Sequence, residues 1–225
     1  MAITIGTSPT LVTATFGAST VATGSFSPPV GSLLVAAVAT VNGETTGLSG
    51  GSLTWTRRVQ SISTFYVEMW TAPAPSGGSG ITASAGLDGI TAAALKVWVL
   101  TGQHASPIGT TGTGATTTNN AAVNAYTSTG SASRGFIVAV DGGTGGTPSS
   151  TDDEEAFGTS FFGLAATKAA NSGASGSTIQ FNLDASGTGA ADWEWAALEI
   201  LAAPDIPRPA RSVTLNQAVH RSTLI

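Results

Sequence analysis

The sequence predicts an all-β protein, a jelly-roll-like antiparallel β-sandwich. Three observations predict this class. Apolar and polar residues alternate at a period of two in several segments, those segments are rich in threonine, valine and aromatic residues, and clusters of glycine, serine, proline and asparagine separate them. The chain has 225 residues, of which 41% are hydrophobic and only 9% charged. This balance excludes a charge-rich disordered chain and allows a substantial core.

The expected strands are of two kinds. They cover residues 31–41, 53–59, 64–71, 94–100, 134–140, 177–184 and 192–204. Segments 33–41 and 134–140 are almost continuously apolar, which indicates strands that are covered on both faces. Segment 64–71 alternates instead, so that one face is expected to be more buried than the other. The stretch 109–120, GTTGTGATTTNN, lacks the lysine of a phosphate-binding loop and is expected to be a simple loop.

A faint internal repeat runs through these strands. Segment 31–39 resembles 134–142, which pairs Leu34 with Ile137, and segment 94–100 resembles 197–203. Both pairs are separated by 103 residues, since 134 − 31 and 197 − 94 are each 103. Repeats of this size could form two tandem sandwiches or two interleaved halves of one sandwich.

We favour one sandwich domain over residues 1–203, with pseudo-repeated halves at about 20–103 and 120–203. Residues 204–225 differ in kind, because three prolines between 204 and 209 favour an extended C-terminal arm. The alternative for this segment is a disordered tail.

The arm and the body have opposite charge. Residues 206–225 carry three arginines and no acid, a formal +3, whereas residues 1–205 carry five basic and thirteen acidic residues, a formal −8. Opposite charge steers association, so we expect the arm to dock on a neighbouring subunit. The expected docking residues are Arg208, Arg211, Val213, Leu215, Arg221, Leu224 and Ile225.

Composition also argues against several functional classes. A net charge of −5 disfavours nucleic-acid binding, and the lack of cysteine removes disulfides and thiolate metal sites. The histidines, His104 and His220, lie 116 positions apart and have no neighbouring triad residue. The first residues lack a secretory signal, and the longest apolar run, 30–41, is too short to cross a bilayer. We therefore expect no enzymatic activity, no cofactor, no metal and no membrane association.

Five tryptophans are the most distinctive side chains. Trp193 and Trp195 are two residues apart, so in a strand they share a face and could form a stacking platform for a sugar ring. The alternative, which we favour, is that they pack in the core. Trp55, Trp70 and Trp98 lie in apolar strand contexts and are expected in the core.

Carboxylates offer two further candidate sites. The run from Asp152 to Glu155 could hold Ca²⁺, but its spacing does not match an EF-hand, and we expect a solvated loop. Glycoside hydrolysis needs two facing carboxylates. Glu68, Glu194 and Glu199 lie on expected strands, yet nothing distinguishes any two of them as such a pair.

The order of these motifs resembles a β-sandwich domain of virion proteins in tailed bacteriophages of actinobacteria. The motifs are VGSLLVAAVA, GSLTWTRRV, VEMWTAPAPSGGSG, ALKVWVLTG, RGFIVAVDGG and DWEWAALEILAAP, from about Ser25 to Pro204. Ser32 stands where an acid is common in such proteins. Each motif is weak alone, and their order is the stronger argument.

The resemblance implies a non-enzymatic minor tail protein or capsid decoration protein, and we lean towards the tail. The implied partners are other virion proteins, such as a tail protein or the major capsid protein, together with copies of the chain in a homo-oligomer, for which a trimer is common. The implied location is the virion, assembled in the host cytoplasm. The alternative function is a carbohydrate-binding module or adhesin that contacts a host-surface glycan.

Overall fold

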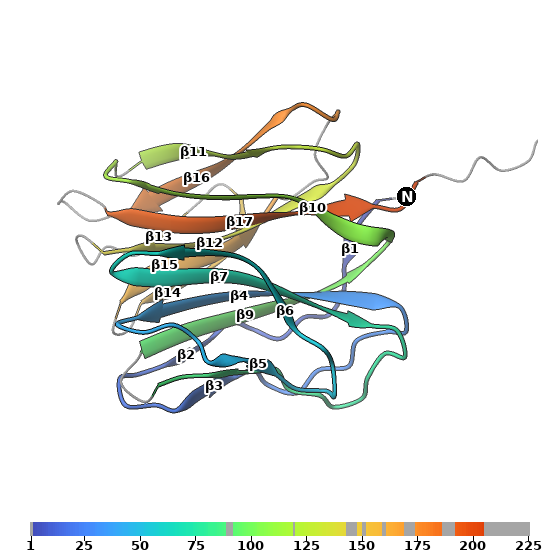
Figure 1. Cartoon of the computed structure of the whole chain (residues 1–225), viewed down its shortest axis with the longest axis horizontal. Coiled ribbons are helices and arrows are strands. Elements are labelled where there is room, and N and C mark those ends of the chain that lie inside the picture. Colours follow the sequence, from blue (N-terminus) through green and yellow to red (C-terminus); the bar gives the residue numbers. More distant parts are fainter. Residues whose placement is uncertain are drawn as a thin grey trace, which may run out of the picture.

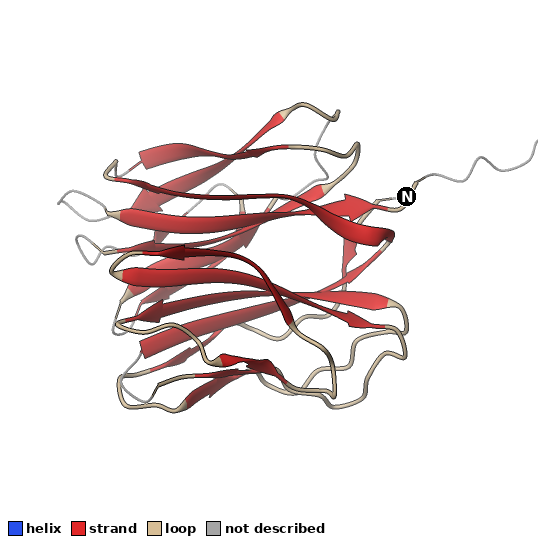
Figure 2. Cartoon of the chain, viewed as in Figure 1, coloured by secondary structure: helices blue, strands red, loops and turns tan. Residues whose placement is uncertain are grey.

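The computed structural model describes residues 2–88, 92–118, 120–142, 148–149, 152–158, 161–168, 174–185 and 192–204. These residues form strands, turns and loops, without a helix among them (Figure 2). The strands are β1 (Thr4–Ile5), β2 (Val12–Ala14), β3 (Thr20–Ala22), β4 (Ser32–Val41), β5 (Gly47–Ser49), β6 (Thr56–Ile62), β7 (Phe65–Ala74), β8 (Ser84–Gly86), β9 (Ala92–Thr101), β10 (Gln103–Thr116), β11 (Asn120–Thr127), β12 (Arg134–Asp141), β13 (Pro148–Ser149), β14 (Asp153–Gly158), β15 (Phe162–Thr167), β16 (Thr178–Ala185) and β17 (Trp193–Ala202). The predicted all-β antiparallel sandwich is confirmed.

The strands form four sheets stacked as layers (Figure 1). The first inner sheet has the order β1-β9-β4-β7-β6, with β2 also paired to β9, and the second inner sheet has the order β10-β17-β12-β15-β14. Two smaller sheets cover them on the outside: the first outer sheet, β3-β8-β5, and the second outer sheet, β11-β16-β13. All the pairings within these sheets are antiparallel.

Three hydrophobic cores lie between the four layers. The central core packs the two inner sheets together and contains Val35, Met69 and Phe136. The other two cores pack each inner sheet against its outer sheet. The continuously apolar segments 33–41 and 134–140 lie on β4 and β12, in the middle of the two inner sheets. Both faces of these strands are therefore buried, as their composition predicts.

The two halves of the chain have the same strand order. Each strand from β2 to β9 has a counterpart in the second half whose label is higher by eight, so that β4 corresponds to β12 and β9 to β17. The counterparts follow one another in the same order in the second inner and outer sheets. The repeated segments 31–39 and 134–142 fall on β4 and β12, which hold the same place in this order. The domain boundaries proposed from the sequence stay a prediction.

The second pair of repeated segments is out of register. Leu95 faces the first outer sheet, whereas Leu198, its expected counterpart, faces the central core. In the observed pairing, Val35 lies beside Trp98, and its counterpart Val138 lies beside Ala196. The structural offset between β9 and β17 is thus 196 − 98, or 98 residues, instead of 103. The two offsets differ by five, and a shift by an odd number of residues moves each side chain to the opposite face of a strand. The match between segments 94–100 and 197–203 therefore reflects similar composition and not equivalent positions.

The inner sheets pack so that the halves contact each other reciprocally. Strand β6 of the first half contacts β10 and β17, and β4 contacts β12. At the other side, the Leu11 amide, next to β2, donates to Glu155 on β14 at 2.5 Å. Strand β6 corresponds to β14, and β2 corresponds to β10. The contact of β6 with β10 is therefore matched by the contact of β14 with the residue next to β2, as in a twofold-symmetric dimer.

Two sequence expectations are corrected. The stretch 109–120 is not a simple loop, because residues 109–116 belong to β10. Trp55 lies before β6 instead of in a strand and is only partly buried, while Trp70 and Trp98 are in the cores as expected. No described segment is a helix with the length and apolar character that crossing a membrane requires.

Candidate functional site

An irregularity in β10 lies beside two hollows of the described surface. Gln103 pairs with Ala202 and Ile108 pairs with Ile200, so five residue steps in β10 lie opposite two in β17. The four residues 104–107 thus lie opposite Leu201 alone, so they cannot all keep the regular pairing. They include Pro107, which has no amide hydrogen to donate to a neighbouring strand.

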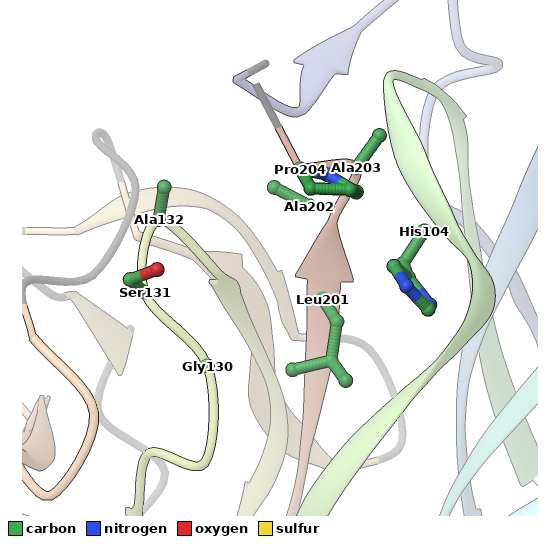
Figure 3. A pocket seen from close by; sticks show the side chains of 8 residues that line it. All are labelled: His104, Gly130, Ser131, Ala132, Leu201, Ala202, Ala203 and Pro204. Atoms are coloured by element: carbon green, nitrogen blue, oxygen red, sulfur yellow. The ribbon is translucent and has the colours of Figure 1, made fainter. Parts of the chain in front are cut away.

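One cavity lies between this bulge and the end of β17. It has a volume of about 260 Å³. Its lining consists of His104, Gly130, Ser131, Ala132, Leu201, Ala202, Ala203 and Pro204. Figure 3 shows His104 on the β10 side of Leu201 and the turn that contains Ser131 on the other side. The amide of Ala203 donates to the Gly102 carbonyl at 2.8 Å, which fixes the end of β17 beside the cavity.

A second cavity lies on the other side of the bulge. It has a volume of about 360 Å³ and is also bordered by His104. Its lining consists of Gly31, Ser32, Leu33, Arg58, Pro73, Pro75, Gln103, His104, Ala105 and Pro107. We call the two cavities together the His104 groove. Its lining is mainly apolar and contains no acidic residue.

Two residues next to the two cavities differ in their exposure. The Gln103 side-chain amide donates to the Gly31 carbonyl at 2.7 Å, but its Oε1 is buried without a hydrogen-bond partner among the described residues. A buried acceptor in that state costs free energy. Val30, directly before Gly31, is 76% exposed.

His104 itself is held by its own strand. Its Nδ1 accepts a hydrogen bond from the Ser106 amide at 2.9 Å. The second histidine, His220, lies outside the described residues. Within the described residues, no group of three histidine, aspartate or glutamate side chains is placed to hold a metal ion.

Glu199 lies at the centre of a buried polar cluster on β17. Its carboxylate accepts hydrogen bonds from the hydroxyls of Ser128 and Ser133, both at 2.5 Å, and from the Thr129 hydroxyl at 2.7 Å. The amides of Thr110 and Thr129 also donate to it. Burial alone would raise the pKa of Glu199, but these donors outweigh it and lower the pKa to about 2. The carboxylate is therefore an anion that connects β17 with β10 and with the residues that follow β11.

Glu68 is held in a similar way on β7. It accepts hydrogen bonds from the Trp70 indole at 2.6 Å, the Thr45 hydroxyl at 2.8 Å and the Gln60 amide at 3.2 Å. The Arg57 guanidinium lies 3.5 Å from it. Its acceptor positions are therefore filled by the fold.

The three glutamates weighed as a glycosidase pair do not share a site. Glu194 faces the central core and accepts hydrogen bonds from Ser61 and Ser63 in the first half. Glu199 lies on the opposite face of β17, since the two positions differ by five, an odd number. Glu68 has another set of partners again. The arrangement required of a general acid and its partner is absent from these three residues.

The acidic run is not the solvated loop that we expected. Residues 153–155 lie in β14, and Asp152 accepts a hydrogen bond from Lys168 at 2.5 Å. Glu155 forms an ion pair with Lys96, a side chain from the other half. Cations from neighbouring strands thus neutralise part of the run, and the lysine ammonium groups contact carboxylates that we had considered for Ca²⁺.

The sugar-stacking platform is wrong. Trp193 is fully buried and Trp195 is 6% exposed, both in the core between the second inner and outer sheets. A Cβ placed on Gly114 would lie 2.5 Å from the Trp195 ring, so β10 covers that ring closely. Neither indole has a free face on which a sugar could stack.

The predicted docking residues of the arm, from Arg208 to Ile225, lie outside the described residues. The His104 groove was not foreseen from the sequence. Its only local signal is Pro107 within a stretch that otherwise forms a strand. Comparisons with models of protein families, with curated proteins and with solved structures give no match for this chain.

Proposed function

We propose that this chain is a non-enzymatic structural protein of a bacteriophage virion, attached to the tail or to the capsid surface. The observation that carries the proposal is that the buried charged groups form hydrogen bonds or ion pairs within the fold. The described part of the chain buries Glu68, Lys96, Asp141, Glu194 and Glu199, and each is bonded to other parts of the fold. Such groups stabilise an architecture and are unsuited to proton transfer with a substrate.

The polar interactions also join the two halves of the molecule. Lys96 and Glu155 form one connection, and Glu194 with Ser61 forms a second. Together with the central core, they favour a rigid body that transmits load between its layers. This property suits a component of a particle better than a binding protein that must open.

The free edges of the inner sheets affect how such a building block would associate. Strand β6 carries Arg57 and Arg58, and β14 carries Asp153 and Glu154. Charged side chains on an edge strand discourage strand addition. We therefore propose that contacts with other virion proteins use side-chain surfaces and the C-terminal arm, within a homo-oligomer for which the resemblance implies a trimer.

The resemblance to tail and decoration proteins supplies the virion assignment, and it favours the tail by a small margin. Assembly in the host cytoplasm follows from the same proposal. The carbohydrate-binding alternative loses its main support, because Trp193 and Trp195 are buried.

The test is the mass of the purified chain in solution, measured by light scattering over a wide concentration range. We expect reversible association into an oligomer of defined size, visible as a regular particle by electron microscopy. A chain that stays monomeric at every concentration and binds glycans on an array would overturn the proposal.

A further inference from the structure

We propose that the His104 groove receives the C-terminal arm of a second copy of this chain. This inference rests on the proposed function, because it identifies the contact through which copies of the building block associate. The inserted part is the segment Val213–Leu215, whose two apolar side chains flank Thr214 and which lies between Arg211 and Arg221.

The position of the last described residue supports this. Pro204, the last described residue, lines the groove. A further 21 residues follow it, since 225 − 204 is 21. At roughly 3.3 Å per extended residue they span about 70 Å at most, enough to reach a neighbouring subunit.

The chemistry of the groove selects the segment. Leu33, Pro73 and Pro107 offer an apolar lining. The apolar side chains of an inserted segment would lose contact with water against this lining. The lining contains Arg58 and no acid, so the arginines of the arm would lie outside the groove, towards the acidic body.

A second copy is the better occupant than the chain's own arm. To enter the groove from Pro204, an arm would have to reverse direction within a few residues. Pro207 and Pro209 favour an extended backbone, which disfavours such a reversal. Each copy would thus offer one arm and one groove, a head-to-tail contact that forms a closed ring if the rotation closes.

The experiment uses two full-length variants. Ala105→Arg places a long charged side chain at an exposed position in the groove, and the double variant Val213→Asp/Leu215→Asp makes the inserted segment charged. The control is Ala22→Arg, the same change at an exposed position on β3 in the first outer sheet. Circular dichroism verifies that all the variants are folded, and sedimentation velocity measures their association.

We expect each variant to weaken self-association by about tenfold or more, and the control to behave as the unmodified chain. An equimolar mixture of the groove and arm variants should form a dimer and grow no further, because it retains one intact arm and one intact groove. An unmodified chain that associates while the mixture stays monomeric would overturn this inference and leave the proposed function standing. An unmodified chain that stays monomeric at every concentration would overturn this inference, and glycan binding by that monomer would overturn the proposed function as well.

Discussion

At the scale of single residues, the hydrogen bonds of Glu199 make stability depend on acid pH. Its folded pKa of about 2 lies below the ordinary value of 4.5. The stabilisation is therefore complete above about pH 4.5 and is lost as the pH falls towards 2. Glu199→Gln should lower the free energy of unfolding at pH 7 by roughly 2–3 kcal/mol, because the new amide group faces other donors.

Urea denaturation at pH 7 and pH 3 measures this effect. The difference in free energy of unfolding between Glu199→Gln and the unmodified chain should be smaller at pH 3, where the Glu199 carboxylate contributes less to stability. Asp153→Asn, an exposed change on β14, is the control and should alter stability little at either pH. Equal stability of Glu199→Gln and the unmodified chain at pH 7 would contradict the assigned role.

The ion pair of Lys96 and Glu155 should respond unequally to loss of each partner. The Lys96 side chain is 5% exposed and that of Glu155 is 39% exposed. Glu155→Gln leaves a buried ammonium without its counter-ion, whereas Lys96→Met leaves a carboxylate that water can reach. We expect Glu155→Gln to be the more destabilising by about 1–2 kcal/mol. Denaturant midpoints at neutral pH measure this, and the reverse order would contradict the explanation.

At the scale of elements, glycine determines where β10 can lie. A Cβ on Gly112 would lie 1.8 Å from the Ala125 carbonyl oxygen in β11. Gly112→Ala should therefore lower the free energy of unfolding by about 1–3 kcal/mol. Gly24→Ala is the matched control, since nothing lies within 4 Å of its Cβ position. Thermal unfolding of both variants measures the difference, and equal melting temperatures would contradict the close approach.

The strands could be predicted where their own composition decides them. Segments 64–71, 94–100 and 177–184 correspond to β7, β9 and β16, because alternating or continuous apolar residues require burial on one or both faces. Segment 109–120 could not be predicted in the same way. Its glycines suggest a loop when considered alone, and only the neighbouring β11 and Trp195 explain why small residues are needed in a strand.

The candidate site was harder to predict than the strands. The groove depends on the register between β10 and β17, which is a property of two distant segments and has no local sequence pattern. The acidic run was misjudged for a related reason. Its glycine-rich flank suggests a loop, whereas Lys96 and Lys168, which contact it, come from other strands.

At the scale of the whole molecule, the central core joins the two halves into one unfolding unit. Phe136 in the second half is fully buried, and its ring centroid lies 5.2 Å from that of Trp98 in the first. Phe136→Ala should cost about 3–5 kcal/mol and should raise amide hydrogen exchange in β4 as well as in β12. Mass spectrometry of peptides from both halves measures this. Faster exchange confined to strands β10 to β17 would contradict shared cooperativity.

The number of layers was beyond the reach of sequence patterns. The repeat was visible between 31–39 and 134–142, but one sandwich or two could not be decided from it. The decision depends on which face of β4 meets β12. Since both faces of these strands are apolar, their sequences fit either arrangement.

Gly102, which links the halves, lies where both ends of the folded body meet. A Cβ on it would lie 2.4 Å from the Ala2 carbonyl oxygen, and its own carbonyl accepts a hydrogen bond from the amide of Ala203. The start, the middle and the end of the fold therefore converge on one point. A circular permutant that joins the two ends and opens the chain at Gly102 would exchange the order of the halves without moving a strand. The geometry of the two ends thus allows either half to come first along the chain.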